Sequence, residues 1–444
     1  MLINNRLPKP PMGWNSFDCY GIFINEEHTL KNLKVFNEKL KPFGYEYFCI
    51  DAGWYSEHEF QLDSKALMDR NSFNLITDKY GRFVASPKLF PHGLKYIADK
   101  IHDYGLKFGI HIMRGIPRIA VEQNTPVKGT EYYARDIADT DSTCIWCPFT
   151  YGVDMNKPGS QEYYNSVIEY LAETGVDFIK ADDIIMFPDE FKAVKKAIDH
   201  CGRPMILSLS PGKQAAKINV KHFKCADMVR LSGDIWDERQ SLTISLDRWN
   251  TWEDVNEPGL WLDLDMIPFG ALQVYVTQDD NSGNILMSGK GCKRMCKFTP
   301  EQKRSFITMR ALAASPLIMG GELTMTPDED FALITNHYIL RCCCNGVTGK
   351  QIFYQNSIDI RKTSEHNSST NGWIGIFNRS ESSKYLMLTP EILKLKAGSK
   401  LFNIWNDCEL YFSNGKLELE IAPDDVCFIR YRKGISNQKA IGEK

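Results

Sequence analysis

The segment Gly175-Val176-Asp177-Phe178-Ile179-Lys180-Ala181-Asp182-Asp183-Ile184 carries an apolar run into a lysine and two acids. Val, Phe and Ile in such a run predict a buried strand. Because side chains alternate along a strand, Lys180 and Asp182 are expected on the same face. Burying a lysine with a carboxylate is costly unless the pair has a function. In βα-repeat proteins, active sites lie at this end of the strands.

Seven other segments have the same strand-like character. They are Met12–Phe17, Tyr45–Asp51, Lys107–Met113, Met205–Ser210, Met228–Asp234, Leu262–Pro268 and Ser315–Gly320. Amphipathic segments such as Gln161–Thr174 and Phe191–His200 lie between several of them and predict helices. Eight strands with intervening helices predict an α/β fold of the (β/α)8 TIM-barrel type. The alternative is an open doubly wound sheet, which is disfavoured because no glycine-rich phosphate fingerprint follows a strand.

The pattern changes near Lys350. Short alternating segments at Gly372–Phe377, Tyr385–Leu388, Leu417–Ile421 and Val426–Tyr431 are separated by Asn, Ser, Gly and Asp clusters. They predict a C-terminal antiparallel β-sandwich. Since 444 residues exceed what one core usually supports, we expect a catalytic barrel over residues 1–345, a sandwich over 346–435 and a polar tail over 436–444.

Composition limits the partners and the compartment. A net charge of -3 gives no reason to expect nucleic acid or an anionic membrane as a partner. The first eight residues lack the apolar core of a signal peptide, and 13 scattered cysteines suit a reducing compartment. We expect a cytoplasmic protein; the alternative is a secreted or periplasmic one whose leader was removed. Whether it forms a homo-oligomer stays open.

Two cysteine pairs have the spacing of half a zinc site. Cys144-x-x-Cys147 and Cys292-x3-Cys296 both lack a second pair at suitable spacing nearby. Buried or surface thiols are therefore expected, and no metal.

Charged residues stand at the ends of several predicted strands. Asp51 ends the second strand, Lys180 and Asp182 the fourth, Arg230, Ser232 and Asp234 share a face of the sixth, and Asp263 and Asp265 a face of the seventh. One such acid alone is explained equally well as a helix cap. Several together predict a polar pocket at the top of the barrel.

Two acids on separate strands, one beside a lysine and one beside an arginine, suit glycoside hydrolysis. Lys180 would keep Asp182 ionised, as a nucleophile requires. Asp234 would have to hold its proton as the general acid. The charge of Asp182 favours a raised pKa for Asp234 and Arg230 opposes it, so this point stays open. Among the tryptophans near strand ends, Trp14 and Trp146 are expected to contact a sugar.

Three other functions compete. Lys180 in a Schiff base is disfavoured because its carboxylate neighbour keeps it charged. A Mg²⁺ site built from the same acids is disfavoured because Asp182 and Asp183 point in opposite directions. A catalytically inactive sugar-binding barrel would keep the tryptophans but does not need both acids.

Several motifs, in this order, resemble the signatures of glycoside hydrolase family 27, the α-galactosidase and α-N-acetylgalactosaminidase family. They are the segments 10–17 (PPMGWNSF), 180–183 (KADD), 230–235 (RLSGDI), 261–266 (WLDLDM) and 313–317 (AASPL). The end of the chain, from Asn403-Ile404-Trp405 to Asp425-Val426-Cys427, also resembles the C-terminal domain of that family.

The resemblance implies a retaining, exo-acting hydrolase that removes a terminal α-D-galactose-like residue, with Asp182 as nucleophile and Asp234 as acid/base. Retention implies carboxyl groups about 5–5.5 Å apart. The sugar subsite would be lined by Trp14, Asp51, Lys180 and Arg230, with Ser208, His111 and Trp146 as further candidates. Neither a metal nor an organic cofactor is implied.

Two departures from the family pattern concern the sugar. The family usually has two consecutive Asp residues on the second strand, which bind the O4 and O6 hydroxyls of galactose; here they are Asp51 and Ala52. One of those contacts is therefore missing or supplied from elsewhere, with His111 and Asp154 as candidates. Leu209 stands where α-galactosidases place a Glu, which leaves α-N-acetylgalactosaminides as an alternative substrate. β-L-Arabinopyranosides are another, since that sugar lacks C6 and family members that cleave it also alter the paired acids.

Overall fold

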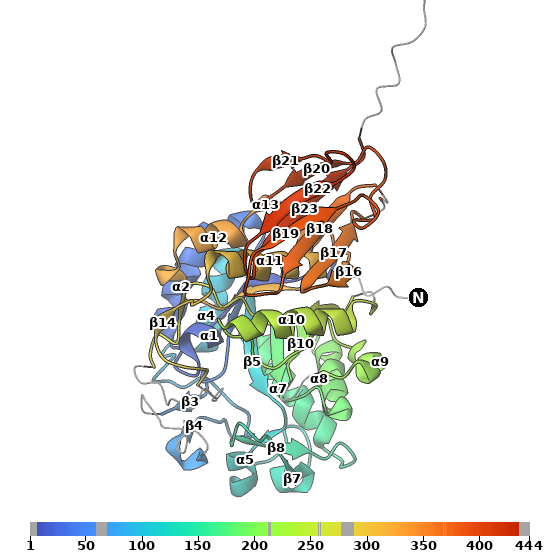
Figure 1. The fold of residues 1–444 in the computed structure, drawn as a ribbon. Coiled ribbons are helices and arrows are strands. Elements are labelled where there is room, and N and C mark those ends of the chain that lie inside the picture. Colours follow the sequence, from blue (N-terminus) through green and yellow to red (C-terminus); the bar gives the residue numbers. More distant parts are fainter. Residues whose placement is uncertain are drawn as a thin grey trace, which may run out of the picture.

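The computed structural model describes residues 7–58, 69–211, 215–255, 257, 259–276, 288–366, 368 and 370–434. The predicted polar tail, 436–444, lies outside the described residues. The chain forms a barrel with a β-sandwich beside it (Figure 1). In the described part of the chain, no helix is both long and apolar enough to cross a bilayer.

The barrel wall is one sheet of eight parallel strands in the order β12-β11-β10-β9-β5-β2-β1-β15. These strands are β1 (Met12–Asn15), β2 (Tyr47–Ile50), β5 (Lys107–Met113), β9 (Phe178–Asp182), β10 (Ile206–Leu209), β11 (Met228–Arg230), β12 (Trp261–Asp263) and β15 (Leu317–Met319). A bridge between Ile267 and Met319 joins the region after β12 to β15. The predicted α/β barrel is confirmed, with a strand inside each of the eight predicted segments or overlapping it.

The predicted sixth and seventh strands are too long. β11 ends at Arg230, so Ser232 and Asp234 lie in the following loop and do not share a strand face with Arg230. β12 ends at Asp263, and Asp265 has a φ of 75°, a left-handed backbone that no strand adopts. Both acids are therefore placed by loop contacts and not by strand alternation.

Helices surround the sheet. They are α1 (Phe17–Tyr20), α2 (Glu26–Lys39), α4 (Gly93–Asp103), α5 (Arg118–Gln123), α6 (Ala134–Ile137), α7 (Ser160–Thr174), α8 (Pro188–His200), α9 (Val220–Phe223), α10 (Arg239–Trp252), α11 (Pro300–Ala313), α12 (Asp328–Ile334) and α13 (His337–Cys344). Helix α7 ends at Gly175, whose φ of 96° is the left-handed cap that glycine adopts without strain.

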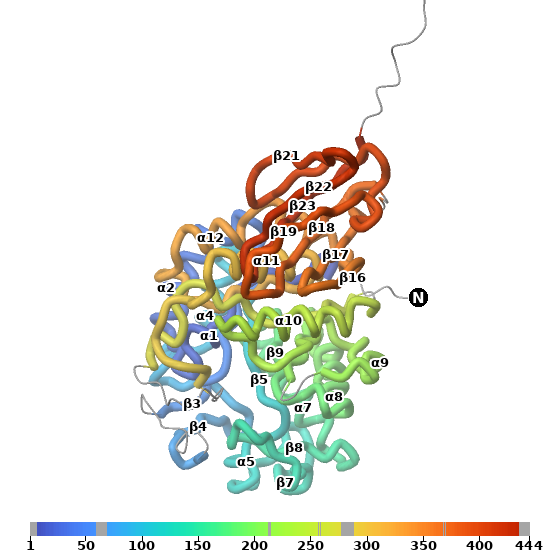
Figure 2. Tube along the Cα trace, viewed as in Figure 1, coloured from blue at the N-terminus to red at the C-terminus, as the bar shows by residue number. Residues whose placement is uncertain are grey.

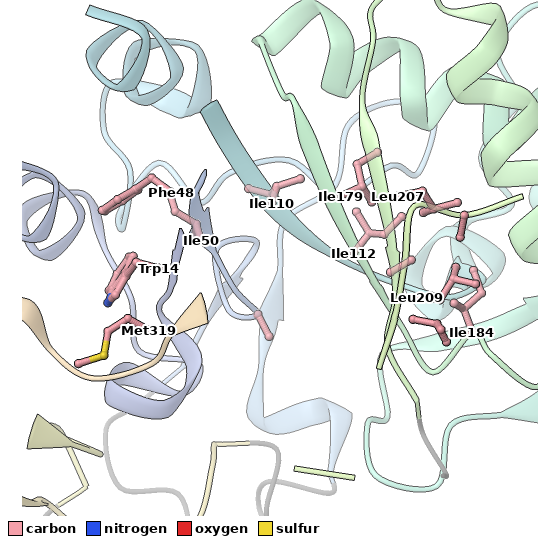
Figure 3. Packing of buried hydrophobic residues seen from close by; sticks show 14 of the residues in the cluster. Trp14, Phe48, Ile50, Ile110, Ile112, Ile179, Ile184, Leu207, Leu209 and Met319 are labelled. Carbon is pink, nitrogen blue, oxygen red and sulfur yellow. The ribbon is translucent and has the colours of Figure 1, made fainter. Parts of the chain in front are cut away.

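The strand faces that point toward these helices are apolar. Ile110, Ile179 and Leu207 occupy neighbouring strands and are fully buried, and Trp14 packs on Phe48 further along the wall (Figure 3). Val- and Ile-rich strands buried on both faces are typical of parallel sheets. This packing holds rigid the strand ends from which the site is built.

Two excursions interrupt the βα alternation. Strands β3 (Ser56–Glu57) and β4 (Asn74–Leu75) pair after β2, while β6 (Ile116–Pro117), β7 (Ala138–Thr143) and β8 (Thr150–Val153) form a small antiparallel sheet after β5. A further short pair, β13 (Ala271–Leu272) and β14 (Arg294–Met295), follows β12. The β7–β8 connection carries Trp146, Cys147 and Phe149 to the top of the barrel.

The C-terminal domain has a six-stranded sheet, β16-β17-β18-β23-β20-β21, and a two-stranded sheet, β19-β22. The strands are β16 (Lys350–Gln355), β17 (Ile358–Ser364), β18 (Gly372–Asn378), β19 (Lys384–Leu388), β20 (Lys400–Asn403), β21 (Cys408–Leu410), β22 (Leu417–Ile421) and β23 (Val426–Arg432). All of their pairings are antiparallel. The trace in Figure 2 shows this domain beside helices α10 and α11.

Ion pairs join the two domains. Arg239 on α10 contacts Asp424 at 2.8 Å, and Arg304 on α11 contacts Asp425 at 2.8 Å. Arg361 on β17, wholly buried, contacts Glu253 after α10 at 3.1 Å. A buried charge requires such a partner, so these contacts fix how the sandwich sits on the barrel.

Candidate active site

A cavity of about 210 Å³ lies at the C-terminal ends of the barrel strands. The residues that line it are Phe17, Asp51, Ala52, Tyr55, His111, Met113, Trp146, Cys147, Phe149, Lys180, Asp182, Pro211, Arg230, Gly233 and Asp234. It therefore combines three acids, three basic side chains and several aromatic rings, which is the composition of a site for a small polar ligand.

Strand alternation explains why polar and charged side chains lie together at this end of the barrel. Inside the barrel, Cys49, Phe178, Ile206 and Met228 form an apolar cluster with Leu7 and Tyr47. Two residues further along the same four strands stand Asp51, Lys180, Ser208 and Arg230. A period of two keeps these polar side chains on the inner face, one layer closer to the top.

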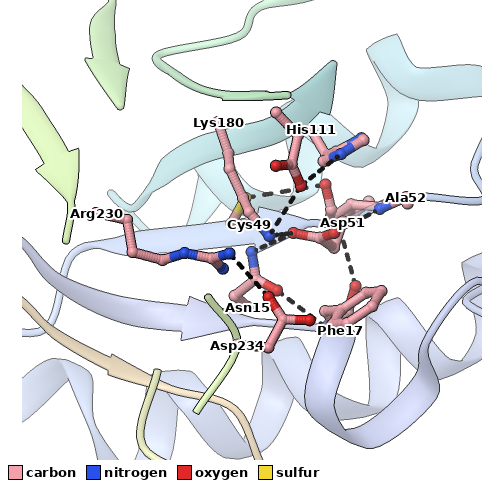
Figure 4. A network of polar contacts seen from close by, with 12 residues as sticks. Asn15, Phe17, Cys49, Asp51, Ala52, His111, Lys180, Arg230 and Asp234 are labelled. Carbon is pink, nitrogen blue, oxygen red and sulfur yellow. Dashed lines mark hydrogen bonds and ion pairs between the residues drawn. The ribbon is translucent and has the colours of Figure 1, made fainter. Parts of the chain in front are cut away.

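Lys180 and Asp51 form a buried ion pair. Lys180 Nζ lies 2.7 Å from Asp51 Oδ2 and 4.0 Å from Asp182 Oδ2 (Figure 4). Asn15 Nδ2 also donates to Asp51 Oδ2, at 2.7 Å. Burial would lower the pKa of Lys180, but the charges of Asp51 and Asp182 outweigh it and raise the pKa above its usual value. A lysine held in its charged form is not a Schiff-base nucleophile.

Asp182 is stabilised in its ionised form. His111 Nε2 lies 3.4 Å from Asp182 Oδ2, and the backbone N–H of Asp183 donates to Asp182 Oδ1 at 3.0 Å. Burial alone would raise the pKa of Asp182, but the hydrogen bond from His111 and the charges of Lys180, His111 and Arg230 hold it well below its usual range. The carboxylate is thus kept unprotonated in a buried site.

Asp234 is in the opposite situation. Its carboxyl accepts from Arg230 Nη2 at 2.8 Å, but Arg230 Nη1 also donates to Asp265 Oδ1 at 3.1 Å. Burial raises the pKa of Asp234 most; Arg230 and Lys180 lower it, and the charges of Asp265 and Asp182 raise it, so that the net shift is upward. Burial, together with the second partner of Arg230, therefore answers the question that the sequence left open.

Asp182 and Asp234 both line the cavity and have opposite pKa shifts. They therefore have the properties of a nucleophile and of a proton donor. This is the pattern by which one pocket performs both acid and nucleophile chemistry near neutral pH.

The sequence placed nine residues in the site, and the structure brings seven of them to this cavity: Asp51, His111, Trp146, Lys180, Asp182, Arg230 and Asp234. The other two, Trp14 and Ser208, line a smaller inner cavity of about 30 Å³ beneath it. Trp14 is 0% exposed, and its indole N–H donates to the carbonyl of Gly321 at 2.8 Å.

Two residues considered for sugar selectivity also lie away from the cavity. Leu209 is fully buried in the core. Asp154 accepts hydrogen bonds from Asn156 and is not among the lining residues. Of the two residues suggested as replacements for the missing second acid, only His111 is therefore in a position to contact a ligand in the cavity.

Several lining residues were not identified from the sequence. Met113 is the last residue of β5, whereas Tyr55, Cys147, Phe149 and Pro211 follow strands or belong to the excursions. Phe17 was within the quoted motif 10–17, and its ring lies 5.4 Å from Lys180 Nζ. The sequence signal that could have identified Phe17 was an aromatic residue at the end of the predicted first strand.

Arg114, which does not line the cavity, contacts the Asp182–Asp183 segment. Its backbone N–H donates to the carbonyl of Asp182 at 3.1 Å, and its guanidinium donates to Asp183 Oδ2 at 3.2 Å and to Glu190 Oε1 at 2.8 Å. Asp183 has a φ of 55°, in the left-handed region that Asp enters more readily than most residues other than glycine. The contacts of Arg114 help to hold it there.

The cysteine pairs form no metal site in the described ranges. Cys144 and Cys147 are free and buried, and Cys292 and Cys296 are free and half-buried. No group of three or more His, Cys, Asp or Glu side chains in the part of the chain described here is arranged to hold a metal ion.

Comparison with known proteins supports this description. Residues 10–141 match the family model described as Alpha galactosidase A. A solved β-L-arabinopyranosidase of family GH27 from Geobacillus stearothermophilus, in complex with arabinose, is 35% identical, with a TM-score of 0.89 and coverage of 98% of this chain and 100% of that one. A putative α-N-acetylgalactosaminidase from Bacillus halodurans is 33% identical, with a TM-score of 0.81 and coverage of 96% and 97%. Alpha-galactosidase 2 of Arabidopsis thaliana is 25% identical over 81% of this chain and 74% of its own length.

The barrel, the sandwich and the pocket with its acids define an exo-acting O-glycoside hydrolase whose substrate is a carbohydrate. The sequence identity of 35% with a GH27 protein, over nearly the whole of both chains, also identifies the family. The chain belongs to glycoside hydrolase family 27.

Proposed function

We propose that this enzyme removes a terminal α-D-galactose-like residue with net retention, with Asp182 as the nucleophile and Asp234 as the acid/base. The observation that supports these roles most strongly is the contrast between the two carboxyls, of which Asp182 has a lowered pKa and Asp234 a raised one. Both line the same cavity.

In the first step Asp234 gives its proton to the glycosidic oxygen while a carboxylate oxygen of Asp182 attacks the anomeric carbon. The bond from that carbon to the glycosidic oxygen breaks, the aglycone leaves as an alcohol, and a glycosyl ester of Asp182 forms. In the second step water attacks the same carbon, Asp234 takes a proton from the water, and the ester bond to Asp182 breaks. Two inversions give net retention.

The remaining polar side chains would bind the sugar hydroxyls. Asp51, with Lys180 and Asn15 as partners, presents an oriented carboxylate at the cavity wall. Lys180, His111 and Arg230 supply donors from three other strands. All four lining side chains are buried, so a hydroxyl that fails to pair with them leaves a polar group without a partner.

A second candidate substrate is a β-L-arabinopyranoside. This sugar has the ring configuration of α-D-galactose but lacks C6, the hydroxymethyl group on C5. Ala52 lines the cavity next to Asp51 and offers only a methyl group where the family usually has a second acid. The hydroxymethyl group of a galactoside would therefore lack that acceptor, while the pentose does not need it. The relative that is 35% identical is named a β-L-arabinopyranosidase.

The test is hydrolysis of four aryl glycosides: α-D-galactoside, α-N-acetylgalactosaminide, β-L-arabinopyranoside and α-D-glucoside. We expect cleavage of the first or the third, no activity in Asp182→Ala, and a first product with the anomeric configuration of the substrate by proton NMR. An inverted first product would contradict retention. Cleavage of only the glucoside would contradict the proposed sugar.

Ala52→Asp separates the two candidate sugars. The new carboxylate would restore the missing acceptor and should raise kcat/KM for the α-D-galactoside relative to the β-L-arabinopyranoside by about tenfold or more. Ala52→Ser, which adds a small polar group without charge, is the matched control. An unchanged ratio in Ala52→Asp would show that Ala52 does not read C6.

A further inference from the structure

A cavity of about 300 Å³, larger than the one at the barrel top, lies in the C-terminal domain. It is formed by Lys362 on β17, Tyr431 on β23, the segment 394–399 that precedes β20, and Thr370 and Lys433 in neighbouring connections. None of these residues belongs to the active site described above.

Four lysines line this cavity: Lys362, Lys394, Lys396 and Lys433. In the described part of the chain no aspartate or glutamate lines it, and no carboxylate lies within the 4.0 Å of an ion pair to any of the four. Many other lysines of this protein do have such a partner, for example Lys195 with Asp199. The cavity is therefore a concentration of positive charge that the described residues do not compensate.

The ammonium group of Lys362 is held in place by two backbone carbonyls and an aromatic ring. It donates to the carbonyls of Leu393, at 3.2 Å, and Lys394, and it lies 4.5 Å from the centre of the Tyr431 ring. Burial, together with the charge of Lys394, lowers the pKa of Lys362 to about 8. An anion beside these two ammonium groups would remove the unfavourable repulsion between them.

The segment that carries Lys394 and Lys396 is held by its own hydrogen bonds. The backbone N–H of Leu395 donates to Pro390 at 2.8 Å, and Ser399 Oγ donates to the carbonyl of Lys396 at 2.7 Å. A wall that is already ordered loses little entropy when a ligand binds. Leu395 and Ala397 add an apolar surface next to the lysines.

We propose that this cavity of the C-terminal domain binds an anionic sugar, with the lysines contacting its carboxylate or phosphate and the apolar wall contacting its ring. Ammonium groups act as point charges and suit either anion. The cavity has the size of a small-ligand site and exceeds what a single inorganic ion needs. The site goes beyond the glycosidase reaction and stands apart from its acids.

The test is isothermal titration of the full chain with D-glucuronate, with D-glucose 6-phosphate and with D-glucose, at matched ionic strength; glucose compounds are used because the proposed active site selects galactose-like sugars. We expect binding of at least one of the two anions in the millimolar range and weaker binding of neutral glucose, and whichever anion binds identifies the charged group. The double variant Lys394→Gln/Lys396→Gln should weaken anion binding about tenfold or more. Lys416→Gln, which removes an exposed lysine outside the cavity, is the matched control and should bind like the wild type.

Activity on the aryl glycosides separates this site from the active site. The double variant should keep the wild-type kcat/KM, which also shows that it folds. If it loses activity, Lys433→Gln, on a different segment, replaces it and should also weaken anion binding. The proposal is overturned if the wild type binds neither anion at about 10 mM, if glucose binds as well as the anions, or if the folded variant binds like the wild type.

Discussion

Arg230 is shared between Asp234 and Asp265, with Nη2 2.8 Å from the first carboxyl and Nη1 3.1 Å from the second. Asp265 Oδ2 also accepts from the backbone N–H of Ile235, at 2.7 Å, the residue after Asp234. One carboxylate therefore competes for the arginine that would otherwise neutralise Asp234 and also fixes the loop on which Asp234 lies. Both effects bear on the proton of the proposed general acid.

Asp265→Asn should lower the pKa of Asp234. The amide keeps an acceptor for Ile235 but removes the charge that raises the pKa of Asp234, and it leaves Arg230 more fully available to Asp234. Because the general acid must be protonated, the alkaline limb of the kcat/KM profile should move to lower pH. A pH–rate profile on an aryl glycoside measures this shift. A loss of activity that is equal at every pH would contradict the electrostatic role of Asp265.

Asp234→Ala should reduce hydrolysis most for substrates with poor leaving groups. Such aglycones depend on protonation, whereas a nitrophenolate leaves without help. We expect kcat/KM to fall by about 100-fold or more for an alkyl glycoside and much less for an activated aryl glycoside in the first step. Equal losses on both substrates would contradict the assignment of Asp234 as the acid.

Strand positions could be predicted because they depend on local composition. The predicted strand Tyr45–Asp51 ends within one residue of β2, and the apolar run before Lys180 lies inside β9. Asp234 and Asp265 are different, since loop contacts with Arg230 and Ile235 place them after their strands have ended. The sequence contained these residues but not the way in which Arg230 is shared.

The direction in which Asn15 points determines the direction of its neighbour Trp14. Asn15 contacts Asp51 in the site, so its neighbour Trp14 must point toward the other face of the strand, where it packs on Phe48. The alternation rule applied from Asn15 would have placed Trp14 in the core. Trp146 and Phe149 could not be placed this way, because they reach the cavity from the β7–β8 connection, whose path depends on tertiary contacts.

Asp263 should make stability depend on pH. Burial, reinforced by the charge of Asp265, raises the pKa of Asp263 to about 7. The folded state therefore holds this proton more tightly than the unfolded chain, whose Asp pKa is about 3.9. The resulting stability is fully present below about pH 4 and is lost as the pH rises through about 7. Urea unfolding at pH 5 and pH 8 measures the difference.

Asp263→Asn should remove that dependence and stabilise the protein at pH 8 relative to the wild type, by at most about 4 kcal/mol from the size of the shift. The asparagine oxygen can still accept from the backbone N–H of Asp265, which lies 2.9 Å from Asp263 Oδ1 in the wild type. Asp69→Asn, in an exposed turn, is a control for the removal of one negative charge. The same difference between pH 5 and pH 8 in Asp263→Asn and in the wild type would contradict the prediction.

Arg114 should be required both for stability and for the position of the nucleophile. Arg114→Met leaves the carboxylates of Asp183 and Glu190 buried without their cation, which typically costs about 3–5 kcal/mol. Arg114→Lys keeps one charge but cannot contact Asp183 and Glu190 with separate nitrogens, so it should recover part of the stability. In both variants we expect kcat to fall more than KM rises, since Arg114 lies behind Asp182 and does not line the cavity. If the folded Arg114→Lys variant retained full kcat, Arg114 would support the fold alone, and the position of Asp182 would depend on His111 and the strand.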